Sequence, residues 1–225
     1  MAVIKITNSD EFKKLLDVLG EDIIRANIFF QLYKGLLDST KDCNKEMNYN
    51  STFWGYTIQS NMDAVMLRIL RIYDQNQNSL NLRNFLDTIK YNISIFDEKD
   101  FKERLKKKHN PFAESLAEDP RKPDSKKLDN DIEKVSNSDP IVEHLEKLRH
   151  NIYFHKAPPT KLTTEQVTEN WPVSYGDIET LLNRAYKIFN HYSSLFEASV
   201  HSRSMSGIKG HEDILKAVRF YHKNK

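Results

Sequence analysis

The sequence predicts an all-α protein with a bundle of about seven to eight helices. Apolar residues recur every three or four positions along most of the chain, which is the period of a helix buried on one face. The chain has only 6 Gly and 7 Pro, too few for a β-sandwich with frequent turns. Because 39% of the 225 residues are hydrophobic, we expect one core and a single domain over residues 1–225.

The helices of the first half are expected from apolar spacing and from capping residues between them. A first helix begins near Ser9, and Gly20 is expected to separate it from a second helix that ends near Leu37. Val3, Ile4 and Ile6 favour a short strand before them. Further helices are expected over residues 52–75, 79–89 and 97–109.

The second half begins with a change of composition. Residues 110–139 are rich in proline and charge, and we expect an exposed connection there with one modest helix. Pro140 then begins a helix, since proline is tolerated in a first turn. An irregular segment, a long amphipathic helix and a last helix are expected over residues 157–172, 177–201 and 210–221.

Composition also excludes several functional classes. The net charge of +2 creates no strong overall field, so RNA binding would need local patches. A single cysteine, Cys43, excludes an internal disulfide framework and fits a reducing compartment. No signal peptide or membrane-spanning apolar run is present, so we expect a cytoplasmic protein without a membrane contact. Neither zinc-type histidine spacing nor a glycine-rich phosphate loop occurs, so we expect no metal and no cofactor.

The segment 148–155 carries the residues that point to chemistry. Arg149 can hold two phosphate oxygens, and His155 can act as general base or general acid near neutral pH. His150 and Asn151 lie between them and would orient the pair or hold the substrate. These residue types suffice for cutting RNA without a metal, since the 2′-hydroxyl of RNA serves as the nucleophile.

The spacing of the motif leaves a structural alternative open. On an ideal helix, Arg149 and His155 point about 120° apart and lie about 9 Å apart along the axis. A loosened helix end or a two-fold dimer would bring such groups together. Alternatively, Arg149 pairs on the surface with Glu143 or Glu146, and His155 caps the helix. Similar spacing occurs at two further sites, so spacing alone is weak evidence: Arg104/His109 and Arg184/His191.

Other polar and aromatic groups have two interpretations each. Lys106, Lys107 and Lys108 would track an RNA backbone, or form a solvated helix face. Arg71 is expected to pair with Asp74 within one helix. A group of aromatic residues would stack bases, although core packing is the stronger interpretation: Phe29, Phe30, Tyr33, Phe53, Trp54 and Tyr56.

The motif resembles the signature of the HEPN superfamily, which is arginine, then Asn, Asp or His, then a few residues, then histidine. Two further stretches resemble its abortive-infection, AbiU-like branch: Phe29 to Leu36, and Phe53-Trp54 followed by Leu67 to Asp74 and then Ser79-Leu80. The bulky Phe154 departs from the pattern of that branch, and residues 161–171 have no counterpart in it.

This resemblance implies a helical bundle that dimerises through the motif helices. It also implies a metal-independent RNA endonuclease, often a toxin in phage defence or in a toxin–antitoxin pair. Arg149 and His155 would be catalytic, His150 would be their polar companion, and the partners would be RNA, a second copy and an antitoxin protein. Some superfamily members bind nucleotides or partner proteins without cutting, so a non-catalytic helical module is the alternative.

Overall fold

The structure is a computed structural model, and it describes residues 3–150, 169–170 and 172–224. Within these residues it has ten α-helices, eight of them with seven or more residues, and no strand. The predicted all-α class is therefore confirmed. The strand expected at Val3 to Ile6 is wrong, because the Ile4 N–H donates to the Thr88 hydroxyl at 2.9 Å rather than to a neighbouring strand.

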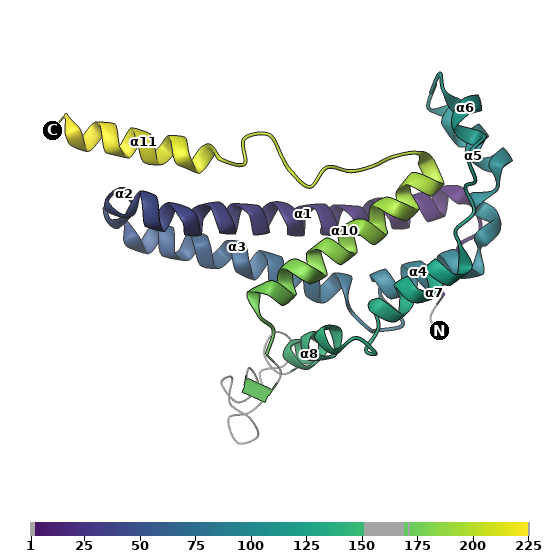
Figure 1. Ribbon diagram of the computed structural model, residues 1–225, viewed down its shortest axis with the longest axis horizontal. Helices are drawn as coiled ribbons and strands as arrows, with labels where there is room; N and C mark the ends of the chain where they lie inside the picture. The colour runs from purple at the N-terminus through teal and green to yellow at the C-terminus, as the bar shows by residue number, and fades with distance from the viewer. Residues whose placement is uncertain (1–2, 151–168, 171, 225) are drawn as a thin grey trace.

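Two long helices run side by side through the molecule (Figure 1). They are α1 (Ser9–Asp42) and α3 (Ser51–Ile72), and the short α2 (Asn44–Asn48) lies between them in the chain. Asn8 and Asn50 cap them by accepting backbone N–H groups at 2.9 and 3.1 Å. Side-chain caps thus define where both helices begin.

The helix break predicted at Gly20 is wrong. Gly20 is buried inside the continuous α1, and a β-carbon added there would lie 2.3 Å from Cζ of Phe189. Phe189 belongs to α10 (Tyr175–Glu197), which crosses α1 in Figure 1. The glycine therefore permits a close approach of α1 and α10 rather than ending a helix.

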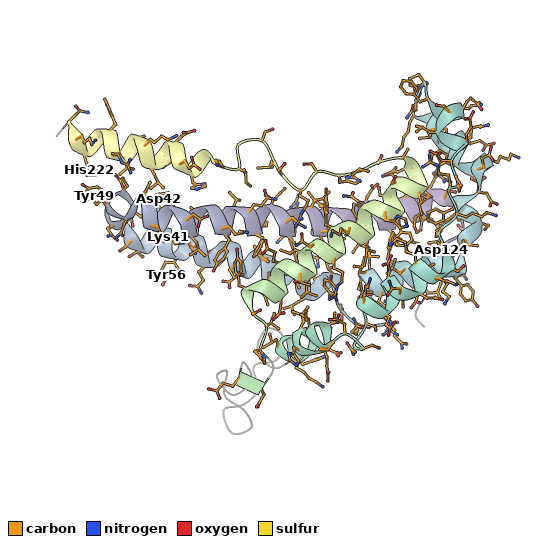
Figure 2. All side chains as sticks on the ribbon, viewed as in Figure 1. Lys41, Asp42, Tyr49, Tyr56, Asp124 and His222 are labelled. Atoms are coloured by element: carbon orange, nitrogen blue, oxygen red, sulfur yellow. The ribbon has the colours of Figure 1, made fainter. Side chains whose placement is uncertain are left out.

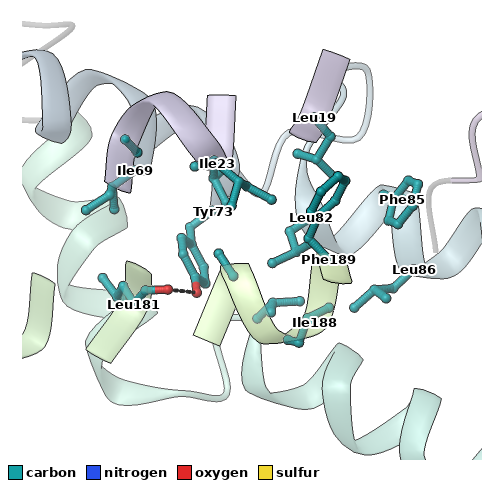
Figure 3. Packing of buried hydrophobic residues seen from close by; sticks show 14 of the residues in the cluster. Leu19, Ile23, Ile69, Tyr73, Leu82, Phe85, Leu86, Leu181, Ile188 and Phe189 are labelled. Carbon is teal, nitrogen blue, oxygen red and sulfur yellow. Dashed lines mark hydrogen bonds between the residues drawn. The ribbon is translucent and has the colours of Figure 1, made fainter. Parts of the chain in front are cut away.

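The main core lies where α1, α3 and α10 meet, as Figure 3 shows. Ser174 and Asp177 form a capping box that fixes the start of α10. The buried Tyr73 hydroxyl donates to the Leu181 carbonyl at 2.7 Å (Figure 3), and burial raises its pKa well above the ordinary value. The hydroxyl therefore stays protonated and ties the end of α3 to α10.

Shorter elements fill the side of the molecule where α10 ends (Figure 1). These are α4 (Leu82–Tyr91), a 3₁₀ turn (Ile93–Phe96), α5 (Glu98–Lys107), α6 (Ala113–Ala117) and α7 (Ser125–Lys134). Within the predicted connection 110–139, α6, α7 and the residue after α7 bury several apolar side chains: Ala113, Ala117, Leu128 and Val135.

Two helices complete the fold: α8 (Pro140–Leu148) and α11 (Gly210–Lys223). The first lies beside the beginning of α10, and the second lies along the far end of α1 (Figure 1). Leu215 of α11 joins a small separate apolar cluster with Leu36, Met47 and Trp54. His222 stacks on Tyr49 with ring centroids 3.5 Å apart, near the C-terminal end in Figure 2.

Candidate functional site

The motif helix α8 is fixed at its start. Asp139 caps it by accepting the N–H groups of Ile141 and Val142, and Pro140 occupies the first turn. Arg184 of α10 lies 2.9 Å from the Asp139 carboxylate and donates to the Lys134 carbonyl at 2.5 Å. One arginine of α10 thus anchors both the end of α7 and the start of α8.

The apolar face of α8 sets the direction in which Arg149 points. Val142, Leu145 and Leu148 are buried at spacings of three residues, and Ile141 is partly buried against the same core. Arg149 follows Leu148 with helical backbone angles of φ −54° and ψ −52°. Its side chain is 19% exposed, so the guanidinium lies at the edge of the core and still reaches solvent.

The guanidinium of Arg149 donates to a carboxylate oxygen of Asp74. Asp74 follows the end of α3 and is nearly buried, with 11% of its side chain exposed. Its carboxylate also accepts the Asn76 N–H at 3.0 Å and the Ser79 hydroxyl at 2.9 Å. The backbone turn after α3 therefore fixes Asp74, and Asp74 fixes the guanidinium of Arg149. The second bond is strong because both partners are charged and partly shielded from water.

The turn that carries Asp74 is held by a network of amide side chains. The Asn76 carbonyl accepts from the side chains of Asn81 at 3.0 Å and Asn84 at 2.9 Å. Asn81 also caps α4, and Gln75 donates to the Val135 carbonyl at 3.0 Å. Because the buried polar groups of this turn satisfy one another, the turn forms a rigid support for the site.

The structure locates part of the predicted site. His150 is 54% exposed, and its Nε2 lies 3.8 Å from Glu146, beyond hydrogen-bonding distance. Asn151 and His155 lie outside the described residues. The Arg149 acceptor Asp74 lies in the turn after α3 and is not among the partners expected from the sequence, which were Glu143 and Glu146.

The predicted pair between Arg71 and Asp74 is wrong. Arg71 instead lies 2.9 Å from the Asp22 carboxylate, because α1 and α3 run side by side and bring these residues together. Asp74 thus remains available to Arg149. The sequence did not identify Asp74 as the partner of Arg149. One signal was present, because the stretch from Leu67 to Asp74, followed by Ser79, is among those that resemble the AbiU-like branch.

The predicted RNA-binding lysines lie at the C-terminal end of α5 and directly after it, and α5 is at a different end of the molecule from α8 (Figure 1). Lys106 is 2.7 Å from Glu114, and Lys108 is 2.6 Å from the buried carboxylate of Glu197. Lys107 is exposed. Two of these three cations are therefore engaged in ion pairs of the fold, and the structure does not bring them next to Arg149.

The part of the chain that the structure describes has neither a metal-binding cluster nor a membrane-spanning helix. No group of three or more His, Cys, Asp or Glu side chains in that part has an arrangement that could hold a metal ion. Among the same residues, no helix combines the length and apolar character needed to cross a membrane.

Comparison with known proteins gives one family. The AbiU2 family model of HEPN proteins (HEPN_AbiU2) matches residues 9–217. No curated protein and no solved structure gives a significant match. Because the matched region runs from the start of α1 into α11 and includes Arg149, the resemblance seen in the sequence is confirmed. The chain belongs to the AbiU2 family of the HEPN superfamily.

Proposed function

We propose that this protein is a metal-independent RNA endonuclease with Arg149 as phosphate clamp and His155 as general acid or base. The observation that carries the proposal is the placement of Arg149. Its guanidinium is partly buried, reaches solvent, and is oriented by Asp74 at the end of a rigid turn. Family membership supplies the expectation that a histidine completes the site.

The chemistry follows from these side chains. A base removes the proton of an RNA 2′-hydroxyl, and the freed oxygen attacks the adjacent phosphorus. The bond from phosphorus to the 5′-oxygen breaks, and an acid protonates the leaving oxygen. The products are a 2′,3′-cyclic phosphate and a 5′-hydroxyl. Arg149 would stabilise the charge on the crowded phosphate, His155 would transfer a proton, and His150 would orient the substrate.

The proposal includes the biological setting. A homodimer would place two copies of the motif helix at one seam, since two-fold symmetry repeats each group. We infer a cytoplasmic toxin in abortive infection or in a toxin–antitoxin pair, with RNA as substrate and an antitoxin protein as partner. These inferences rest on family membership.

One observation favours a second candidate, a non-catalytic module that binds a nucleotide, a nucleic acid or a partner protein. Arg149 already donates to the Asp74 carboxylate, so an incoming phosphate has to share the guanidinium with a fixed anion. In this candidate the Arg149–Asp74 pair stabilises the junction of α3 and α8 and takes no part in cutting.

Cleavage of total cellular RNA in EDTA tests the proposal. Wild type is compared with Arg149→Ala and His155→Ala, and with two controls, Arg25→Ala at a surface ion pair and His109→Asn at an exposed position. Loss of cutting in the first two variants alone, with unchanged circular dichroism, supports the proposal. Equal cutting by all five proteins places the activity elsewhere, and no cutting by any of them favours the binding module.

A further inference from the structure

A polar groove lies between α7 and α10, on a part of the molecule that the motif does not include. Its volume is about 580 Å³. Three groove residues of α7 are spaced by four and three positions: Lys127, Asp131 and Lys134. Groove residues of α10 are spaced by three, one, three and one positions: Thr180, Asn183, Arg184, Lys187 and Ile188. Each set therefore lies on one helix face, and the two faces line the same groove.

The groove carries excess positive charge. Its two carboxylates are engaged within the fold: Asp131 binds Lys127 at 3.0 Å and the Tyr192 hydroxyl at 3.1 Å, and Asp139 binds Arg184. Lys134 and Lys187 are exposed, and no ion pair is found for either among the residues that the structure describes. Two ammonium groups therefore remain available to an anion.

Lys127 and Asp131 of the groove also act on a neighbouring histidine of α10. His191 of α10 has a pKa below its ordinary value, first because it is partly buried and second because of the positive charge of Lys127, with Asp131 opposing. The two charges oppose each other at the imidazole, and burial is the larger cause of the shift.

The groove adjoins the start of the motif helix. Arg184 lines the groove and binds Asp139, the residue that caps α8. Arg149 comes ten residues after Asp139, which corresponds to about 15 Å along a helix. Figure 1 shows the end of α7 close to the start of α8, and α8 beside the beginning of α10. A strand lying in the groove therefore has a short path to Arg149.

We propose that this groove binds the phosphodiester backbone of an RNA strand on its way to Arg149, with Lys134 and Lys187 as phosphate contacts. Thr180 and Asn183 supply a hydroxyl and an amide for phosphate or sugar oxygens. The described residues that line the groove include no aromatic side chain, so bases have no stacking platform there. Contact is thus made to the backbone and is independent of sequence. This inference rests on the proposed RNA endonuclease.

The test measures binding of a short fluorescent 2′-O-methyl oligouridylate in EDTA. This probe keeps the phosphates, and it cannot be cut because the nucleophilic 2′-hydroxyl is blocked. The double variant Lys134→Gln/Lys187→Gln is compared with wild type and with Lys126→Gln/Lys99→Gln, which removes two exposed lysines outside the groove. Binding is followed over a series of salt concentrations.

The groove variant should bind about tenfold more weakly, and the slope of log K against log salt should fall by about 1.4, since each phosphate contact on a single strand contributes about 0.7. The control variant should keep the wild-type slope. Equal affinities and slopes for all three proteins overturn the proposal, as does an equal loss in the control variant.

A parallel assay of total-RNA cleavage separates this inference from the proposed function. If wild type cuts RNA and the groove variant binds the probe like wild type, the groove inference fails and the endonuclease stands. If the groove variant binds weakly and no protein cuts RNA, the groove stands as a binding site and the endonuclease fails.

Discussion

Arg149 donates to the carboxylate of Asp74, a residue 75 positions earlier in the chain. The bond joins the end of α8 to the end of α3. Asp74 is held by Asn76 and Ser79 as well, so the carboxylate position does not depend on Arg149 alone. The turn after α3 therefore acts as the support on which the motif arginine is oriented.

Replacing Asp74 by Asn should lower the free energy of unfolding by about 2 kcal/mol, because the amide keeps the shape but cannot neutralise the partly buried guanidinium. Urea denaturation measures the change. Asp129→Asn is the matched control, since Asp129 pairs with Lys90 at a more exposed position, and it should cost less than about 1 kcal/mol. Equal costs for the two variants would contradict the structural role of Asp74.

Gly20→Ala should destabilise the fold by about 1–3 kcal/mol, because the new methyl group overlaps the Phe189 ring in a packed core. Gly55→Ala is the control within α3, where nothing lies within 4 Å of the added β-carbon. That change should stabilise the protein by about 0.5–1 kcal/mol, since alanine is the better helix former. Thermal unfolding of both variants checks the opposite signs; shifts of the same sign would refute the close approach.

Leu215→Ala should loosen α11 while leaving the main core intact. Leu215 is 1% exposed and fills the small cluster with Leu36, Met47 and Trp54, whereas Ile214 is 57% exposed. Amide hydrogen exchange should therefore rise in α11 for Leu215→Ala and stay unchanged for Ile214→Ala. Increased exchange throughout α1 and α3 in the Leu215 variant would show that α11 is part of the main cooperative unit.

The free energy of unfolding should decrease as the pH is lowered below about 6.5, partly because of His191. Its pKa in the folded protein is below the ordinary value of 6.5, chiefly because the imidazole is partly buried, so the unfolded chain binds more protons in that range. The contribution is fully present above pH 6.5 and is lost as the pH falls toward the folded pKa. His191→Gln should have a flatter dependence of the urea midpoint on pH. Parallel curves for both proteins would contradict the burial of a neutral imidazole.

Aromatic residues illustrate where periodicity misleads. Phe30 and Trp54 are buried as expected, but Phe53 and Tyr56 are 57% and 66% exposed. Neighbours such as Phe53 and Trp54 point about 100° apart on a helix, so both cannot face one small cluster. An apolar count identifies the helix, and the packing partners decide which of its faces is covered.

The sequence by itself determined the helical class, the capped start of α8 at Asp139 and Pro140, and the motif that begins at Arg149. These features depend on residues within about four positions of one another, because helical hydrogen bonds and caps are local. The tertiary structure alone decided that Asp74 accepts a hydrogen bond from Arg149 and that Lys106 and Lys108 form ion pairs. It also decided that α7 and α10 line one polar groove. Such pairings join distant segments, and they depend on how buried apolar faces dock, which local spacing does not specify.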